Sequence, residues 1–228
     1  MSRPVGARVT LLVSQFPSLL GADVGTQDHQ GGAEALRRAV STGRSAGSED
    51  HPLFAAVYDR LNGSLEREVL APRRAELLRD LEGEVLEVGA GTGAGPRHFD
   101  RAARVVAVDP DRAMRRRLGA KLAEAGVPVE IADAPAESLP FPSASFDAVG
   151  FACARCTICD PDRALAEARR VLMPTGRLVV LEHVRGYGRL AGWQDRITPL
   201  WSRLMAGCHP NRDTAGAIER AGFWFQRV

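Results

Sequence analysis

Residues 84–93, EVLEVGAGTG, decide the fold of this chain. A short apolar run leads to Glu87, and the glycines Gly89, Gly91 and Gly93 follow it. Glycine adopts backbone conformations that are closed to other residues, and it lets a ligand approach the main chain. A strand that ends in such a loop and leads into a helix is typical of nucleotide-binding α/β proteins.

Apolar runs and helical patterns alternate after this stretch. The runs have few polar interruptions and are expected to be strands at 84–88, 104–108, 129–132, 146–151 and 177–181. Helical patterns lie between most of them, notably at 112–125 and 161–172. Runs of Val and Leu without polar alternation indicate strands that are buried on both faces of a parallel sheet. We therefore predict a doubly wound, Rossmann-like α/β fold with helices on both faces of the sheet.

Asp109 ends the second predicted strand. An acidic side chain at that place of a nucleotide-binding fold accepts hydrogen bonds from ribose hydroxyls. Gly89, Gly91 and Ala94 also satisfy the dinucleotide pattern G-x-G-x-x-A. A nucleotide-dependent oxidoreductase is therefore a rival interpretation. Glu87 argues against it, because a carboxylate before the first glycine repels a pyrophosphate and attracts an ammonium group.

Longer matches support another family. The stretches EVLEVGAGTG, VVAVDP, ADAPAESLPFPSASFDAV and ALAEARRVLMPTGRLVVLEHV follow one another in consistent order. Together the chain resembles a class I S-adenosylmethionine (SAM)-dependent methyltransferase over about residues 53–223. The C-terminal part is similar to the branch that contains alkyl-thiol methyltransferases, as judged from EHV at 182–184, WQ at 193–194 and GC at 207–208.

The resemblance implies SAM as the cofactor and assigns its contacts. The residues expected to bind it are Tyr58, Glu87, Gly89, Ala90, Gly91, Asp109, Pro110, Asp133, Ala134, Phe151 and Ala152. The glycines line the methionine end, with Glu87 near the amino group, and Asp109 holds the ribose. Asp133 and Ala134 meet the adenine, while Phe151 and Ala152 border the sulfonium. An alternative interpretation of Tyr58 is an ordinary core residue.

Two residues are candidates for a catalytic base. His183 follows the fifth strand on the side where the acceptor is expected, and Asp195 is a weaker candidate. Either side chain also suits a structural role. Trp193 and Trp201 are eight residues apart, so one helical face can present both as the wall of an apolar acceptor pocket.

The family pattern also divides the chain into parts. Residues 1–50 are rich in Gly, Ser and Ala and are expected to be a flexible arm. Residues 51–228 form the expected methyltransferase domain, with a helical lid at 52–82 and a core at 83–228. Residues 223–228 are interpreted as the sixth strand, which leaves no sequence for the usual antiparallel seventh. Since an unpaired sheet edge favours association, we expect a homodimer through the C-terminal edge.

Composition excludes several classes of partner. The net charge of +2 gives no reason to expect a nucleic acid or a membrane as partner. The apolar run at 9–20 is short and interrupted, so we interpret the chain as non-secretory and cytoplasmic. The cysteines Cys153, Cys156, Cys159 and Cys208 lack a second ligand pair, so no metal site is predicted.

The sequence therefore predicts methyl transfer to a small, fairly apolar molecule through a thiol, nitrogen, oxygen or carbon atom. A specialised metabolite suits this description as well as a simple thiol does. The alternative is a SAM-binding protein that no longer methylates and acts as a scaffold or a non-methylating cyclase. The absent seventh strand motivates that alternative.

Overall fold

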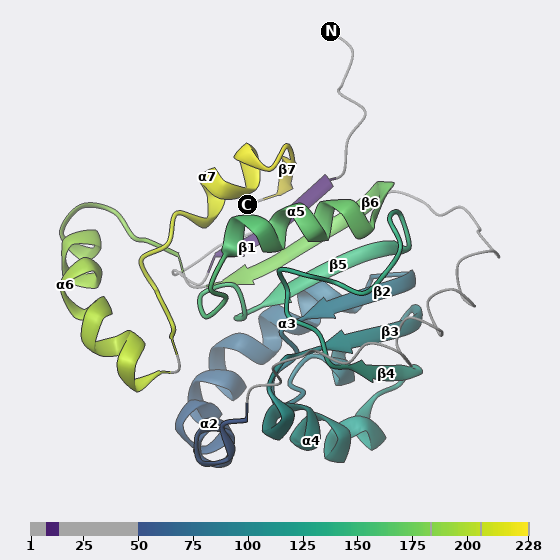
Figure 1. Cartoon of the computed structure of the whole chain (residues 1–228), viewed down its shortest axis with the longest axis horizontal. Coiled ribbons are helices and arrows are strands. Elements are labelled where there is room, and N and C mark those ends of the chain that lie inside the picture. Colours follow the sequence, from purple (N-terminus) through teal and green to yellow (C-terminus); the bar gives the residue numbers. More distant parts are fainter. Residues whose placement is uncertain (1–7, 14–49, 183, 206, 228) are drawn as a thin grey trace, which may run out of the picture.

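The fold is a seven-stranded parallel sheet covered by helices on both faces (Figure 1). The computed structural model describes residues 8–13, 50–182, 184–205 and 207–227. In the order β4-β3-β2-β5-β6-β1-β7, the strands are Val129–Ala132, Ala102–Val108, Gly83–Val88, Phe146–Ala152, Leu172–Glu182, Arg8–Val13 and Trp224–Arg227. The predicted doubly wound α/β architecture is confirmed.

Alternate residues of the central strands pack against different helices. Val85 and Val105 share a buried cluster with Leu77 and Leu78 of α3. The neighbouring residues Leu86 and Val106 share the other large cluster with residues of α5 and α7. Successive side chains of a strand point to opposite faces, so apolar residues at both positions of each pair require helices on both faces.

The helices lie mostly where the sequence predicts them. Their bounds are α2 Pro52–Leu65, η1 Glu66–Leu70, α3 Ala71–Leu78, η2 Pro96–His98, α4 Arg112–Lys121, η3 Leu122–Glu124, α5 Pro161–Val171, α6 Gly188–Leu204 and α7 Thr214–Arg220. Pro72 lies in the first turn of α3, directly after the π-helical turn η1. Proline has no N–H to donate to the preceding turn, so a change in helical winding is expected there.

The prediction that the chain lacks a seventh strand is wrong. β1 pairs in parallel with β6, from Arg8 opposite Arg177 to Val13 opposite Glu182, and also pairs with β7. Val9 is fully buried in the core beside α5 and α7. The N-terminal strand thus lies between β6 and β7 as a seventh strand, which we did not expect from the sequence.

This finding changes two further expectations. Part of the predicted flexible arm is a sheet strand, while residues 1–7 and 14–49 lie outside the described residues. The homodimer stays a prediction, but its basis is now the outer edge of β7 and not a missing strand. The division of the chain at residue 50 also stays a prediction.

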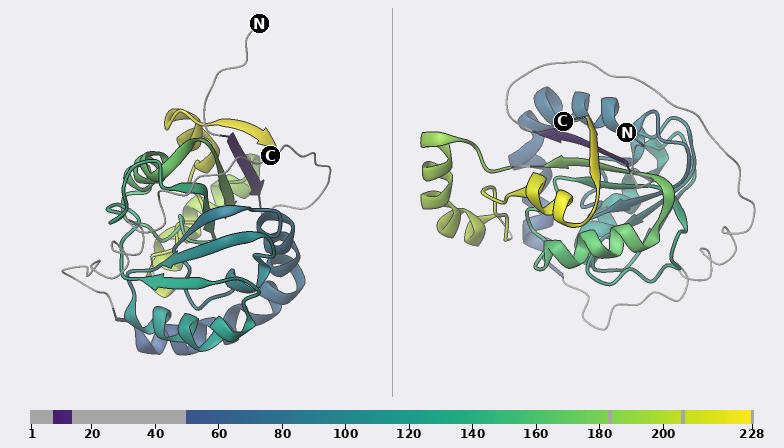
Figure 2. Two further views of the ribbon diagram at one scale, coloured as in Figure 1. Left: turned by 90° about the vertical axis from the view of Figure 1, so that its right-hand side faces the viewer. Right: turned by 90° about the horizontal axis from the view of Figure 1, so that it is seen from above.

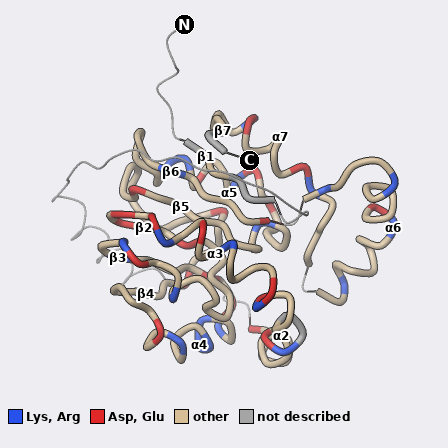
Figure 3. The backbone as a smooth tube through the Cα atoms, turned by 180° about the vertical axis from the view of Figure 1, so that it is seen from behind, with Lys and Arg blue, Asp and Glu red and all other residues tan. Residues whose placement is uncertain are grey.

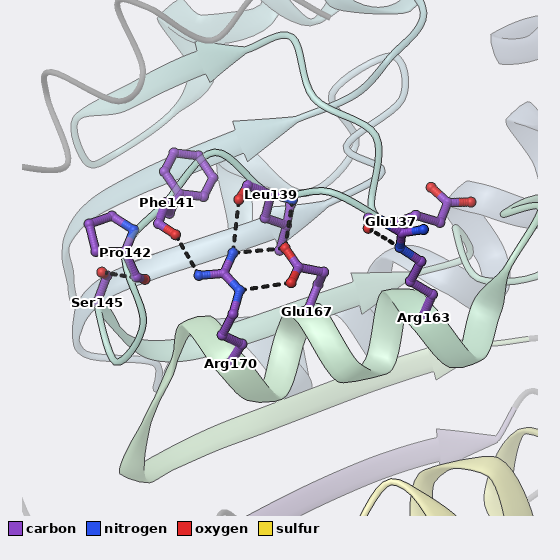
Figure 4. Close-up of polar contacts among 8 residues, drawn as sticks. All are labelled: Glu137, Leu139, Phe141, Pro142, Ser145, Arg163, Glu167 and Arg170. Atoms are coloured by element: carbon purple, nitrogen blue, oxygen red, sulfur yellow. Dashed lines mark hydrogen bonds and ion pairs between the residues drawn. The ribbon is translucent and has the colours of Figure 1, made fainter.

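The loop between β4 and β5 is fastened to α5 (Figure 4). Arg170 of α5 donates hydrogen bonds to the carbonyl oxygens of Leu139 and Phe141, at 2.9 and 2.7 Å. Glu167, one turn earlier, forms an ion pair with Arg170 and accepts a bond from the Leu139 N–H at 2.8 Å. The loop therefore has a fixed course where it passes the site described next.

Candidate active site

A cavity of about 1160 Å³ lies at the carboxyl ends of the central strands. Its walls come from the loops after β2, β3, β4 and β5, from the helices α2 to α3, and from the end of α6. In open parallel sheets, ligands bind in the crevice outside the carboxyl ends of the strands. The cavity is therefore the candidate active site.

The glycine-rich loop forms one wall of the cavity. Gly89 and Gly91 both have positive φ, +69° and +56°, which disfavours residues with a side chain. A Cβ at Gly89 would lie 2.4 Å from the Cβ of Ala154, whereas a Cβ at Gly91 would meet no atom within 4 Å. Gly89 is thus needed for packing between two loops, and Gly91 leaves open space beside the backbone.

Asp109 holds the glycine loop in place. Its Oδ2 accepts a hydrogen bond from the Gly91 N–H at 2.9 Å, and its Oδ1 accepts one from the Asp111 N–H at 2.9 Å. A carboxylate has about four acceptor positions, so about two remain for a ligand. Burial raises the pKa of Asp109 to about 6, although the two backbone bonds oppose this rise.

Glu87 lies behind the loop and not on the cavity wall. Its Oε1 is close to Gly95, where an added Cβ would collide with it. Its Oε2 is buried without a hydrogen-bond partner among the described residues. Burial raises the pKa of Glu87 to about 7, even though the nearby Arg74 cation favours the ionised form. Its carboxyl group is therefore about half ionised near neutral pH.

The other predicted cofactor residues divide into two groups. Those that line the cavity are Tyr58, Ala90, Pro110, Ala134 and Ala152. Asp133 does not line it, and its Oδ2 pairs with Arg115 at 2.8 Å. Phe151 is fully buried in the sheet core and also does not line it. Its side chain follows the strand alternation, which turns Phe151 towards α5 and leaves Ala152 at the cavity.

The N-terminal helices close one side of the cavity. Asp59 of α2 accepts a hydrogen bond from the Thr92 hydroxyl and pairs with Lys121 at 3.0 Å. Arg74 of α3 is buried, yet it lines the cavity. Its Nη1 donates to the Ala152 carbonyl at 3.3 Å, and its Nε pairs with Glu66 at 3.1 Å. These contacts fasten the helical segment to the glycine loop and to β5.

Glu182, at the end of β6, shapes the opposite wall. Its Oε1 accepts hydrogen bonds from the N–H groups of Ala154 and Arg155, at 2.8 and 2.6 Å. These residues follow Cys153, which has the unusual φ of +60°. Burial raises the pKa of Glu182 to about 7, against the effect of both N–H groups. The carboxyl group thus positions the loop that packs on Gly89.

Thiols occur along this wall of the cavity. Cys153, Cys156, Cys159 and Cys208 all line it, and all are free. The segment after α6 joins them, because the His209 N–H donates to the Cys156 carbonyl at 2.8 Å. A side-chain hydrogen bond between the thiols of Cys156 and Cys208 raises the pKa of Cys156 and lowers that of Cys208. Trp201 and Met205 lie beside them on the cavity wall.

Of the two predicted catalytic bases, the structure describes only Asp195, which does not line the cavity. His183 lies outside the described residues, so its role stays a prediction. Asp195 is exposed on α6, pairs with Arg185 at 2.7 Å and accepts a bond from Asn211 at 3.0 Å. The hydrogen bond from Arg185 lowers the pKa of Asp195, which makes it a weaker base.

Sequence reasoning did not find Arg74, Glu182 or the thiol wall. Arg74 belongs to a helix with many arginines, so its burial has no local signal. Glu182 stands directly before His183. We predicted the catalytic base at His183, because histidine is the commoner catalytic base. Three of the cysteines are close together in the sequence, but their approach to Cys208 depends on the course of the chain after α6.

Two negative findings concern only the described part of the chain. No helix in it is long and apolar enough to cross a bilayer. No three side chains among its histidines, cysteines and acidic residues converge as a metal site.

Comparisons with known proteins agree with the geometry. A family model described as a methyltransferase domain matches residues 86–180. The human thiol S-methyltransferase TMT1B is 34% identical over 184 residues, which cover 75% of this chain and 73% of the relative. The ubiquinone/menaquinone biosynthesis C-methyltransferase UbiE of Bordetella avium is 33% identical over 159 residues, which cover 60% of this chain and 62% of the relative.

A solved structure shares the fold. It is the phosphoethanolamine N-methyltransferase 2 of Haemonchus contortus, in a complex that contains S-adenosylhomocysteine. The TM-score is 0.54 at 19% sequence identity, and the match covers 74% of this chain and 44% of the other.

Proposed function

Because the chain belongs to the class I SAM-dependent methyltransferases, we propose that it methylates a small, fairly apolar acceptor, and in the first place a thiol. Its cofactor is SAM, which supplies a methyl group already activated on a sulfonium. The protein then has to hold the acceptor in line with this methyl group and to exclude water.

The residues around the glycine loop are suited to hold the cofactor. Asp109 keeps about two acceptor positions for the ribose hydroxyls, and Ala134 and Pro110 offer apolar contact to the adenine. The open space beside Gly91 admits the methionine part. Glu87 supplies negative charge for its ammonium group, and the buried Arg74 supplies a cation for its carboxylate.

The observation that carries the choice of acceptor is the chemistry of the other wall. Cys156, Cys208, Ile158, Met205 and Trp201 provide sulfur, aliphatic and aromatic surface on this side of the same cavity. These five side chains offer no strong hydrogen-bonding group and favour an apolar ligand, and the hydrogen-bonding side chains in the same part of the lining are Thr157, Ser202 and Arg203. An apolar molecule with one reactive atom directed at the methyl group is the ligand that this wall suits best.

A thiol acceptor also suits a wall whose described residues offer no catalytic base. Among the described residues, the cavity-lining positions within 152–159 and 201–208 include no carboxylate and no imidazole. A free thiol has a pKa of about 8.5, so a useful fraction is already thiolate near neutral pH. An alcohol of much higher pKa needs a base to remove its proton. His183 is the residue that we propose for that task where an acceptor requires it.

The test uses three acceptors that share one hydrocarbon chain and differ in the reactive atom. Hexanethiol, hexanol and hexylamine are each incubated with SAM and the purified protein, and methylated products are measured by mass spectrometry. We expect the thioether to form fastest, with S-adenosylhomocysteine in equal amount. Transfer to the amine or the alcohol in preference to the thiol would contradict the choice of nucleophile.

A broader acceptor panel tests methyl transfer itself. If the protein binds SAM but yields no methylated product from any acceptor, the scaffold or cyclase alternative replaces the enzyme proposal. The four free thiols suit a reducing compartment, so we place the reaction in the cytoplasm as part of the same proposal.

A further inference from the structure

Helix α6 presents an apolar face that the described part of the chain leaves exposed. Trp193, Leu200 and Leu204 expose 58%, 63% and 66% of their surface, and Leu190 and Trp201 are also exposed. These positions recur at helical spacing and therefore share one side of the helix. A cluster of large apolar side chains in water is unusual on a monomer and marks an interaction surface.

The fold does not need this face to hold α6 in place. Ala191 and Thr198 are the buried residues of the helix, and by helical spacing they lie about a third of a turn from the centre of the apolar face. Gln194 fastens that side, since its amide accepts a hydrogen bond from the Gly186 N–H at 2.7 Å and donates to the Val184 and Pro210 carbonyls. The helix stands apart from the sheet and from the helices that cover it (Figures 1 and 2).

A row of cations borders the apolar face. Arg189, Arg196 and Arg203 are spaced by seven residues, or about two turns, so they align along α6 beside the Trp and Leu side chains. All three are exposed. Asp195 is the one acidic residue of the helix, and it is occupied by Arg185 and Asn211. Figure 3 shows the basic positions along α6.

We propose that α6 docks on the surface of an anionic lipid bilayer. The side chains of Leu190, Trp193, Leu200 and Leu204 enter the boundary between headgroups and acyl chains, and the three arginines bind lipid phosphates. Aromatic and leucine side chains on one side of a helix, with arginines beside them, are the features of helices that lie in the plane of a membrane surface. In this proposal α6 lies on the bilayer surface and does not cross the membrane. The proposal depends neither on the proposed acceptor nor on the methyl transfer.

Charge favours a bilayer over a second copy of the chain. In a symmetric pair of α6 helices, each apolar face would bring its arginine row to the interface, and the helix has no free carboxylate to compensate it. Anionic phosphates provide this compensation. The net charge of +2 does not reveal the arginine row of α6, because acidic residues elsewhere in the chain balance its positive charge. Composition therefore gave no reason to expect a membrane partner.

The first experiment compares binding of the full chain to vesicles of phosphatidylcholine alone and of phosphatidylcholine mixed with phosphatidylglycerol, by flotation. We expect binding to the mixed vesicles and much weaker binding to the neutral ones. Replacing Trp193, Leu200 and Leu204 together by serine should abolish flotation. The double variant Arg189→Gln/Arg196→Gln should weaken binding by about fivefold for each arginine removed.

Two arginines elsewhere provide the matched control. Arg112 and Arg116 are exposed on α4, and Arg112→Gln/Arg116→Gln changes the net charge by the same amount. This variant should keep vesicle binding. Equal loss in both double variants would overturn the proposal, because binding would then follow net charge and not α6. Equal flotation with neutral and anionic vesicles, or none with either, would overturn it as well.

A fluorescence measurement tests the location of the contact. The chain has three tryptophans, and Trp201→Phe/Trp224→Phe leaves Trp193 alone. Its emission should shift to shorter wavelength when the mixed vesicles are added and should be quenched by brominated acyl chains. Emission typical of a buried indole in the vesicle-free monomer would show that another part of the chain covers the face. A dimer that the triple serine variant dissociates would assign the face to a second copy. Either result contradicts the proposal.

Discussion

The wall of the cavity around Asp109 and the wall around Cys208 differ in how the chain holds them. The Asp109 wall is fastened by hydrogen bonds to backbone N–H groups and by ion pairs from the helices around it. The Cys208 wall is formed mainly by thiols and apolar side chains, some of them at the end of α6. The first arrangement suits one unchanging ligand, and the second suits acceptors of varying shape.

Glycine substitutions in the first wall should have the largest effect. Gly89→Ala introduces a Cβ that overlaps Ala154, and its positive φ alone costs about 1–2 kcal/mol. We expect a lower melting temperature and no measurable binding of S-adenosylhomocysteine by calorimetry. Gly91→Ala has the same cost from φ but no clash within the protein, so it should lose binding with a smaller change in stability.

Gly119→Ala, in α4 and away from the cavity, is the control for these variants. Its Cβ would make only an ordinary contact with Ile131 at 3.8 Å, and alanine favours helix by about 1 kcal/mol over glycine. It should bind S-adenosylhomocysteine as the wild type does. Normal binding in Gly89→Ala would show that the loop does not form the cofactor wall.

The pH dependence of cofactor binding should be the next largest effect. Glu87 has a raised pKa of about 7, because it is buried, so its carboxyl group gains a proton as the pH falls below that value. Only the ionised form attracts the ammonium group of the cofactor. The affinity for S-adenosylhomocysteine should therefore fall with decreasing pH, by up to about tenfold per unit below about pH 7.

Glu87→Gln should reduce this dependence between about pH 6.5 and 7.5, a window that lies above the pKa of about 6 of Asp109. Glu182, whose pKa is also about 7, titrates in the same window and accounts for any slope that the variant keeps. Glu68→Gln, at an exposed position of η1, should leave it unchanged. If the slope is the same in the wild type and in Glu87→Gln, the proton is taken up elsewhere and Glu87 has no part in binding.

The smallest effect on the cofactor is expected from the second wall. Trp201→Ala removes an aromatic side chain from the cavity and should raise the KM for the acceptor about fivefold, which corresponds to about 1 kcal/mol of lost contact. The affinity for S-adenosylhomocysteine should stay within about 0.5 kcal/mol of the wild type. Trp193→Ala, on the same helix but outside the cavity lining, should change neither value in a vesicle-free assay. Weaker cofactor binding in Trp201→Ala would mean that the two walls are not separate.

The same contrast explains what the sequence reveals about the site. The Asp109 wall is built from residues that are close in sequence to strand ends, so Gly89, Gly91 and Asp109 could be predicted from local patterns. Arg74, Glu182 and the contact of Cys156 with Cys208 join segments that are far apart in the chain. Those contacts depend on tertiary packing, which no local pattern encodes.

The fold shows the same limit. The central strands are runs of Val and Leu that are buried on both faces, and this pattern is visible in the sequence. β1 is an apolar run as well, but it lies in a region rich in Gly and Ser, and its partners β6 and β7 are far along the chain. Its position in the sheet could therefore not be predicted. For this reason we wrongly expected from the sequence that the seventh strand was missing.

The most direct test of the account is calorimetric titration of the wild type and Asp109→Ala with S-adenosylhomocysteine, with NADH as the comparison ligand. We expect the wild type to bind S-adenosylhomocysteine and not NADH. Asp109→Ala should bind it more weakly by about 1–3 kcal/mol, the scale of hydrogen bonds to a charged group. Unchanged affinity in a folded Asp109→Ala variant would contradict the placement of the cofactor beside the glycine loop.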